Sequence, residues 1–318
     1  MIIFWILLSI ILFAVFVALL TSFVCFLRVF YSPRKKCKEE YPIPKGEIYE
    51  EYREQMTEWI KEMRKREHRS VEITSFDGLT LRGKYYEQKK GAPIDILFHG
   101  YRGWAERDLC GGINRCFSIG HNALVVDHRA SGESDGHVIT FGIYESRDCE
   151  DWVKFVLREI DPNAEIYLGG VSMGAATVMI AAGRELPKQV RAAVADCGYT
   201  SAKEIIEKVI QEMKLPPKLL YPFVKLGAKL FGHFDLEECS PIEGMRNAQI
   251  PVIFFHGDTD DFVPFEMSRQ NYEACQTKKR LVTVEGAGHG LAYPKNTTLY
   301  CSELSEFFEN TCGRTAVR

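Results

Sequence analysis

The chain has 318 residues, of which 46% are hydrophobic and 26% are charged, so its composition is that of a globular protein with one large domain or two small ones. Lysine and arginine number 40 against 43 aspartates and glutamates, and this near balance gives no support for a nucleic-acid partner. The 10 cysteines show neither the spacing of a disulfide framework nor a CxxC metal pair, so reduced, scattered thiols are expected.

An uncharged apolar run opens the sequence. Residues 1–27 contain no charged side chain, and only Ser9, Thr21 and Ser22 interrupt the run. As a helix it is about 40 Å long, which is enough to cross a bilayer with tilt. A secretory signal peptide is the alternative, but the run has neither a basic start nor an A-x-A cleavage site. We predict a single-pass membrane anchor over residues 1–30.

The charges around this run predict its orientation. Basic residues lie only on its C-terminal side, at Arg28, Arg34, Lys35, Lys36 and Lys38. The positive-inside rule therefore predicts that the remainder of the chain lies in the cytoplasm.

Residues 31–69 are predicted to form a linker and an amphipathic helix. Pro42 and Pro44 are typical of a linker, and after them apolar residues recur at helical spacing at Ile48, Tyr52, Met56, Trp59, Ile60 and Met63. A helix on the membrane surface is one interpretation, but that interpretation needs a basic polar face. Here the polar face carries glutamates, so we expect the helix to pack on the flank of a folded domain.

Residues 70–318 alternate between strand and helix patterns. Two alternating segments joined at Asp77-Gly78 predict a β-hairpin. Apolar runs typical of strands buried on both faces follow at Ile94–His99, Ala123–Asp127, Glu165–Gly169, Ala192–Asp196, Val252–His256 and Leu281–Glu285. Helices are predicted among them at Glu106–Ile119, Glu145–Ile160, Ala175–Leu186, Phe265–Ala274 and Ser302–Glu309. This alternation predicts an α/β fold with a mostly parallel sheet flanked by helices.

A small helical cap is predicted at about residues 199–250. The connection between Asp196 and Pro251 is too long for an ordinary loop, and Ala202–Met213 and Pro217–Phe231 within it have helical patterns. A cap over the carboxyl edge of the sheet would lie where ligands bind in open α/β folds. Its apolar residues either line an acyl pocket or pack on the sheet: Leu219, Leu220, Tyr221, Phe223, Val224 and Leu226.

A G-x-S-x-G pattern spans Gly170–Gly174, between a predicted strand and a predicted helix. A serine at such a turn has strained backbone geometry, and side chains two residues to either side would collide. The turn would expose Ser172 as a nucleophile and leave the Met173 N–H free to stabilise an oxyanion. The alternative is a glycine-rich turn in which the serine only caps the helix.

A nucleophilic serine needs a base to remove its proton and an acid to orient the base. In the chain, the acid is expected after the serine and the base after the acid. Among the 8 histidines, His289 alone follows the last predicted strand, so it is our candidate base. Asp260 is the preferred acid over its neighbours Asp258 and Asp261, with Asp196 as an outside candidate. The second oxyanion donor is expected after the strand that ends at His99, at the N–H of Tyr101.

Several of these motifs together resemble the α/β-hydrolase superfamily, in its serine aminopeptidase-like and carboxylesterase-like branch. They are Phe98-His99-Gly100, Asp127-His128-Arg129 with Gly132 and Ser134, Gly170–Gly174, His256-Gly257-x-x-Asp260-x-x-Val263-Pro264 and Gly288-His289. The resemblance covers the chain from about Val71 onward. It implies a catalytic triad of Ser172, Asp260 and His289, with backbone oxyanion donors at Tyr101 and Met173.

Three functions follow as hypotheses. The first is a serine hydrolase that cleaves acyl esters through an acyl-enzyme, and the second is an aminopeptidase-type peptidase with the same triad. The third is a non-catalytic binding protein on a hydrolase fold. We expect no cofactor and no metal, because the triad needs neither. The expected partners are a small acyl ester or short peptide as substrate and a membrane through the N-terminal helix.

Overall fold

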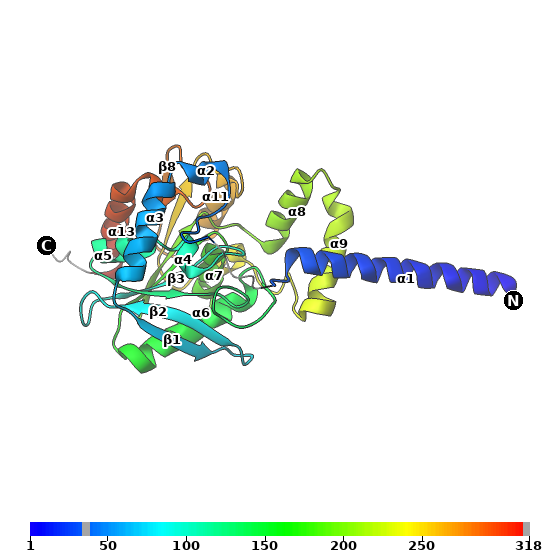
Figure 1. The fold of residues 1–318 in the computed structure, drawn as a ribbon, viewed down its shortest axis with the longest axis horizontal. Coiled ribbons are helices and arrows are strands. Elements are labelled where there is room, and N and C mark those ends of the chain that lie inside the picture. The colour runs from blue at the N-terminus through cyan, green and yellow to red at the C-terminus, as the bar shows by residue number, and fades with distance from the viewer. Residues whose placement is uncertain (34–38, 314–318) are drawn as a thin grey trace.

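The structure, a computed structural model, describes residues 1–33 and 39–313. Within these residues eight strands form one sheet in the order β1-β2-β4-β3-β5-β6-β7-β8 (Figure 1). Their bounds are β1 Arg69–Thr74, β2 Thr80–Tyr86, β3 Ile94–Phe98, β4 Asn122–Val126, β5 Ile166–Val171, β6 Val190–Asp196, β7 Val252–Gly257 and β8 Lys279–Val284. β2 pairs antiparallel with β1 and β4, and the other neighbours are parallel. The predicted hairpin and parallel sheet are confirmed.

Helices cover both faces of this sheet. On one face, α6 (Ile143–Phe155), α7 (Met173–Ala182) and α10 (Pro241–Arg246) contribute to the core that buries Ile96, Leu168 and Phe254. The other face is covered by α3 (Arg53–Lys65), α5 (Gly112–Ser118) and α13 (Thr297–Cys312). Shorter or peripheral elements complete the set: α4 (Ala105–Asp108), η1 (Val156–Ile160), α11 (Phe265–Ala274) and α12 (Ala292–Lys295).

The prediction of one continuous helix over Glu106–Ile119 is wrong. The structure has two short helices there, α4 and α5, and Gly111 occupies the N-cap position of α5. Two consecutive glycines interrupt the pattern, and glycine is a poor residue for a helix interior because it loses the most backbone freedom on folding. The last helix is also longer than predicted, because Asn296 caps it by accepting from the N–H of Leu299.

The predicted amphipathic helix is present as α2 (Glu47–Glu50) and α3, with a break at Tyr52. Met56, Ile60 and Met63 of its apolar stripe are buried against the other elements of the folded domain. The stripe is therefore a packing surface, which confirms the flank interpretation over the membrane-surface one.

The first helix, α1 (Ile2–Val29), extends away from the rest of the molecule (Figure 1). Among residues 1–33 and 39–313 it is the one helix long and apolar enough to span a membrane. Near its C-terminal end, Ser22 and Phe26 are buried, as is Phe30 just after it. Of the basic residues used to predict orientation, Arg28 lies in the last turn of α1, and Arg34, Lys35, Lys36 and Lys38 lie outside the described residues.

The inner end of α1 packs on a helical cap. The cap contains α8 (Ala202–Glu212), α9 (Pro217–Gly227) and the π-helix η2 (Ala228–Gly232), followed by α10. Ser201 starts α8 by accepting from the N–H of Glu204, and the prolines at 216 and 217 separate α8 from α9. Helix α10 was not predicted from the sequence. Its close approach to α7 depends on Gly244, where a Cβ would lie 2.3 Å from the carbonyl oxygen of Met179.

Candidate active site

Ser172 occupies a sharp turn between β5 and α7. Its backbone has φ +56° and ψ −114°, a conformation that residues other than glycine rarely adopt. The glycines on either side are required by space. A Cβ on Gly170 would lie 2.1 Å from Gly174, and one on Gly174 would lie 2.1 Å from the carbonyl oxygen of Phe98. The strand-turn-helix context and the steric reason for both glycines are as the sequence predicted.

This crowding predicts that Gly174→Ala destabilises the protein. The new methyl group meets the backbone of β3, which cannot move without disturbing the sheet, so we expect a loss of about 1–3 kcal/mol. Thermal unfolding of the purified protein measures the loss. Gly100→Ala is the matched control, because a Cβ there is at least 3.4 Å from its neighbours. Equal melting temperatures for the two variants would contradict the prediction.

Ser172, His289 and Asp260 are joined by hydrogen bonds at the carboxyl edge of the sheet. His289 Nε2 lies 2.9 Å from Ser172 Oγ, and His289 Nδ1 lies 2.7 Å from Asp260 Oδ2. A carboxylate only accepts, so Nδ1 carries the proton and donates it to Asp260. Nε2 is then free to accept the Ser172 hydroxyl proton. This is the tautomer that a histidine needs in order to act as a base on the serine.

Asp260 is held in place by more than His289. Its Oδ1 accepts from the N–H groups of Phe262 and Val263 at 2.9 and 2.8 Å. Burial alone raises the pKa of Asp260, but hydrogen bonds from His256 and His289 outweigh it and hold the pKa below its usual range. The group therefore stays ionised at neutral pH, as an acceptor for His289 requires.

His256 is a contributor that the sequence interpretation missed. Its Nε2 lies 2.8 Å from the carbonyl oxygen of Val263 and 3.2 Å from Asp260 Oδ2, while Ser268 Oγ lies 2.6 Å from its Nδ1. The carbonyl accepts only, so Nε2 carries the proton. The second contact of His256, to Asp260, was not predicted because it depends on how the loop after β7 folds back.

The other carboxylates considered as the acid have different surroundings. Asp258 accepts from the N–H of Gly286 at 2.6 Å, and Asp261 is exposed. Asp196 is buried, and burial raises its pKa to about 6. Of these four carboxylates, Asp260 is the one bonded to His289 Nδ1.

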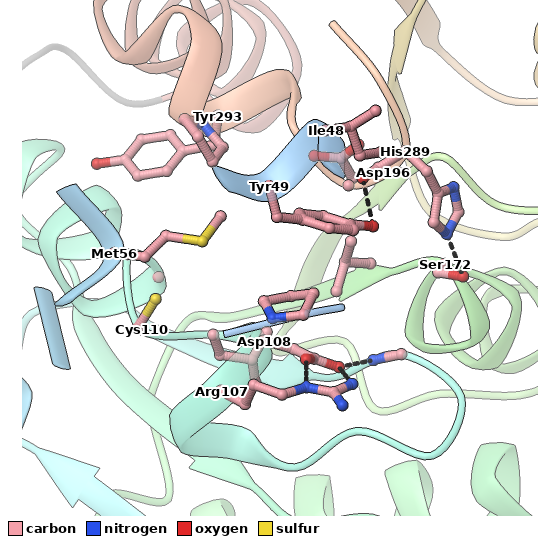
Figure 2. A pocket seen from close by; sticks show the side chains of 18 of the residues that line it. Ile48, Tyr49, Met56, Arg107, Asp108, Cys110, Ser172, Asp196, His289 and Tyr293 are labelled. Atoms are coloured by element: carbon pink, nitrogen blue, oxygen red, sulfur yellow. Dashed lines mark hydrogen bonds and ion pairs between the residues drawn. The ribbon is translucent and has the colours of Figure 1, made fainter. Parts of the chain in front are cut away.

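A cavity of about 700 Å³ opens beside Ser172 and His289. Figure 2 shows both residues at one side of it, with Met56 and Cys110 at the opposite side and Tyr49 between them. Tyr49 comes from α2, and its hydroxyl donates to the backbone carbonyl of His289 at 3.0 Å. A segment 240 residues from His289 along the chain thus helps to line the candidate site.

The cap residues do not form this cavity. We considered an acyl pocket lined by Leu219, Leu220, Tyr221, Phe223, Val224 and Leu226, but the cavity wall contains none of these six. Tyr221 and Val224 are buried in the cap itself, and Leu219 is exposed. The apolar wall comes instead from α2, α3 and the segment around α12, at Ile48, Tyr49, Met56, Trp59, Tyr293 and Pro294.

Comparison with known proteins agrees with this fold. The family model for the α/β-hydrolase fold matches residues 96–233. The chain has the α/β-hydrolase fold. The uncharacterised protein YqkD of Bacillus subtilis is 30% identical over 193 residues, which cover 60% of this chain and 63% of YqkD. The match therefore spans less than two thirds of that relative.

Solved structures of esterases and peptidases share the hydrolase fold. An esterase from Pyrococcus furiosus, Pf2001, aligns with a TM-score of 0.66 at 23% identity and covers 89% of this chain and 98% of its own. A puromycin-hydrolyzing peptidase from Mycobacterium tuberculosis aligns with a TM-score of 0.60 at 17% identity and covers 79% of this chain and 40% of its own. At these identities the likeness shows the fold alone.

The loop that was predicted to carry the second oxyanion donor lies against Ser172. A Cβ on Gly100 would be 3.6 Å from the Cβ of Ser172, so the backbone that leads to Tyr101 passes beside the turn at Ser172. The roles of the Tyr101 and Met173 N–H groups stay predictions, because they depend on where a substrate oxygen would sit.

The same loop is tied to α1. The Tyr101 hydroxyl donates to the carbonyl of Val29 at 2.6 Å. The Arg102 guanidinium donates to the carbonyls of Arg28 and Tyr31 at 2.8 and 3.1 Å. The carbonyls of Arg28 and Val29 lie at the C-terminal end of the helix, where backbone oxygens lack partners within the helix, and Tyr31 follows just after it. Helix α1 is therefore attached directly to the loop beside Ser172.

Among residues 1–33 and 39–313, one group of side chains has the spacing of metal ligands. The donor atoms of Cys197, Asp260 and His289 all lie within 4.8 Å of one another. Burial raises the pKa of the Cys197 thiol well above its usual range, which disfavours the thiolate that a metal would need. A metal on His289 Nδ1 would also have to displace its bond to Asp260. The donor set fits a hydrogen-bonded chain better than a metal site.

Proposed function

We propose that the protein is a serine hydrolase that cleaves acyl esters through an acyl-enzyme. The observation that carries this proposal is the chain of bonds from Ser172 through His289 to Asp260, at the edge of a cavity. A serine hydroxyl becomes a useful nucleophile only when a base is placed to remove its proton. This geometry provides the base in the required tautomer and an ionised acid to orient it.

The residues would act in two stages. His289 takes the proton of Ser172 as Oγ attacks the carbonyl carbon of the ester, and the N–H groups of Tyr101 and Met173 stabilise the oxyanion. His289 then gives the proton to the leaving alcohol, which leaves an acyl group on Ser172. Water enters, His289 removes its proton, and hydroxide attack on the acyl carbon releases the acid. The proton returns to Ser172, so the enzyme is regenerated.

The cavity favours an ester with an apolar group. Its wall is mostly apolar near Met56, Trp59 and Tyr293, so a hydrocarbon chain would be buried there without unpaired polar atoms. The volume of about 700 Å³ is within the usual range for a small-molecule site.

A peptidase is the second candidate. An aminopeptidase would need carboxylates to hold a free α-amino group, and several line the same cavity: Glu47, Asp108, Asp196 and Asp261. The cap glutamates considered for this purpose do not line it: Glu204, Glu207, Glu212, Glu237 and Glu238. The proposal for an ester rests on the apolar wall of the cavity, and the peptidase alternative rests on its carboxylates.

A substrate panel separates the candidates. The full chain in detergent, assayed with p-nitrophenyl esters of graded length and with aminoacyl-nitroanilides, is expected to hydrolyse the esters and to leave the anilides intact. The full chain is needed because Phe26 and Phe30 are buried in the folded domain, so removal of α1 would expose its core. Preferred hydrolysis of the anilides would assign the peptidase, and no turnover of either would favour the binding protein.

We also propose that α1 anchors the protein in a membrane with the hydrolase domain in the cytoplasm. Basic residues lie on the C-terminal side of the apolar run, so a reporter fused after Arg318 is expected to be active in the cytoplasm. The orientation is measured with two fusions, one to a reporter that is active only in the cytoplasm and one to a reporter that is active only on the other side of the membrane. Activity of the external reporter alone would reverse it.

A further inference from the structure

Helix α9 and the adjoining η2 expose an apolar stripe on their outer side. Leu219 is 63% exposed and Leu230 is 41% exposed, while Phe223 and Leu226 between them are half-buried. Their spacing of i, i+4, i+7 and i+11 places the four side chains on one face of a helix. A continuous apolar face of this kind is unusual on a surface that meets only water.

The other faces of the same segment have partners or charges. Tyr221 and Val224 are buried in the cap. Gly227 contacts α1 so closely that a Cβ there would lie 2.4 Å from the carbonyl oxygen of Ser22. Helical periodicity gathers three basic side chains on the remaining flank, beside the apolar stripe: Lys218, Lys225 and Lys229. Lys225 also pairs with Glu237 at its edge.

The position of α1 gives the direction in which this stripe faces. α9 crosses α1 near Ser22, and the part of α1 before that residue projects away from the molecule (Figure 1). α8 lies between α9 and the sheet, so the outer face of α9 looks along α1 towards its N-terminal end (Figure 1). Residues 2–21 would be about 30 Å long, which matches the hydrocarbon thickness of a bilayer.

We propose that α9 and η2 lie in the headgroup region of the bilayer, with Leu219, Phe223, Leu226 and Leu230 against the acyl chains. The flanking lysines then extend towards lipid phosphates, as basic side chains at membrane interfaces do. This inference rests on the proposed anchoring by α1. The occupant of the stripe is lipid because the stripe is continuous with a helix of membrane-spanning length and faces the same way.

The arrangement would hold the candidate site at the membrane surface. The C-terminal end of α1 bonds to Tyr101 and Arg102, and the cap packs on the same end of the helix. Two elements thus fix the hydrolase domain to the bilayer, so the domain cannot rotate freely about α1. Acyl esters dissolved in the bilayer would then be the accessible class of substrate.

Photolabelling of the full chain in vesicles tests this inference. The vesicles contain phosphatidylcholine and phosphatidylglycerol, and the probe is a phosphatidylcholine with a diazirine either near the carboxyl end of one acyl chain or at its terminal carbon. Mass spectrometry locates the labels. We expect the shallow probe to label peptides that contain Leu219–Leu230, and the deep probe to label the middle of α1 but not α9. Peptides from α3, whose apolar stripe is buried, serve as the internal control.

A pair of variants makes the test specific. In Leu219→Glu/Leu230→Glu the label on α9 is expected to fall by about tenfold or more while the label on α1 remains, because burial of each leucine favours the apolar phase by roughly that factor. The matched control is Met213→Glu/Leu215→Glu, which changes two exposed apolar residues of the same cap outside the stripe and should keep the α9 label.

The outcomes separate this inference from the proposals on which it depends. Labelled α1 with unlabelled α9 would overturn the inference and leave the anchor standing, whereas unlabelled α1 would overturn both. Dimers in detergent that are lost in the Leu219→Glu/Leu230→Glu variant would assign the stripe to a second copy of the chain instead. Neither the photolabelling nor the dimer measurement uses substrate turnover, so neither depends on the proposed esterase activity.

Discussion

Replacement of Ser172 with alanine is expected to abolish covalent labelling by a fluorophosphonate and to lower kcat by about 10⁶-fold, as in other triads. Such probes capture a serine whose hydroxyl is activated by a base. Here the base is His289, with Nε2 at 2.9 Å from Oγ. His289→Ala is expected to reduce kcat by a similar factor, because serine and base act as one unit and their losses do not add.

The measurement combines gel fluorescence of the labelled protein with turnover of one activated ester. Ser302→Ala is a suitable control, since Ser302 lies on α13 and its hydroxyl only donates to the carbonyl of Leu299. Circular dichroism shows whether each variant is folded. Persistent labelling of folded Ser172→Ala protein, or no labelling of the wild type, would contradict the proposed nucleophile.

The fold was predictable because its signals are local. Strands buried on both faces are apolar along their whole length, and the predicted strand over Val252–His256 corresponds to β7 at Val252–Gly257. The turn at Ser172 was predictable for a similar reason, since the two glycines of Gly170–Gly174 report a steric requirement that the structure shows. Local patterns of this kind do not depend on which distant segments meet.

The parts that were not predicted depend on distant contacts. The cavity wall combines Tyr49 with His289, and the bond between them joins segments that no periodicity relates. The hydrogen bond from Tyr101 to Val29 could not be predicted either, because the sequence of α1 indicates only a long apolar helix. One of the two interpretations of the apolar cap residues, an acyl pocket, was wrong for the same reason. Apolar cap residues predict burial, but not against which neighbour.

The last prediction concerns the acid. Asp260→Asn is expected to lower kcat by about 10⁴-fold while the protein stays folded. The asparagine oxygen can still accept from the N–H groups of Phe262 and Val263 at Oδ1, so the loop keeps its shape. Its amide nitrogen then faces His289 Nδ1 and donates to it, which forces the proton of the ring onto Nε2. In that tautomer His289 cannot accept the proton of Ser172.

Three matched substitutions show whether this loss is specific, all assayed with one activated ester at neutral pH after thermal unfolding confirms the fold. Asp258→Asn removes charge from a carboxylate that accepts from the N–H of Gly286, and Asp261→Asn changes an exposed group, so both should retain most activity. Asp196→Asn alters a buried carboxyl with a pKa of about 6 whose side chain lines the cavity, so KM is expected to change more than kcat. Asp260→Asn should be the least active of the four by a wide margin, because Asp260 Oδ2 is 2.7 Å from His289 Nδ1. A lower kcat for Asp196→Asn would transfer the role of acid to that residue and leave Ser172 and His289 in theirs.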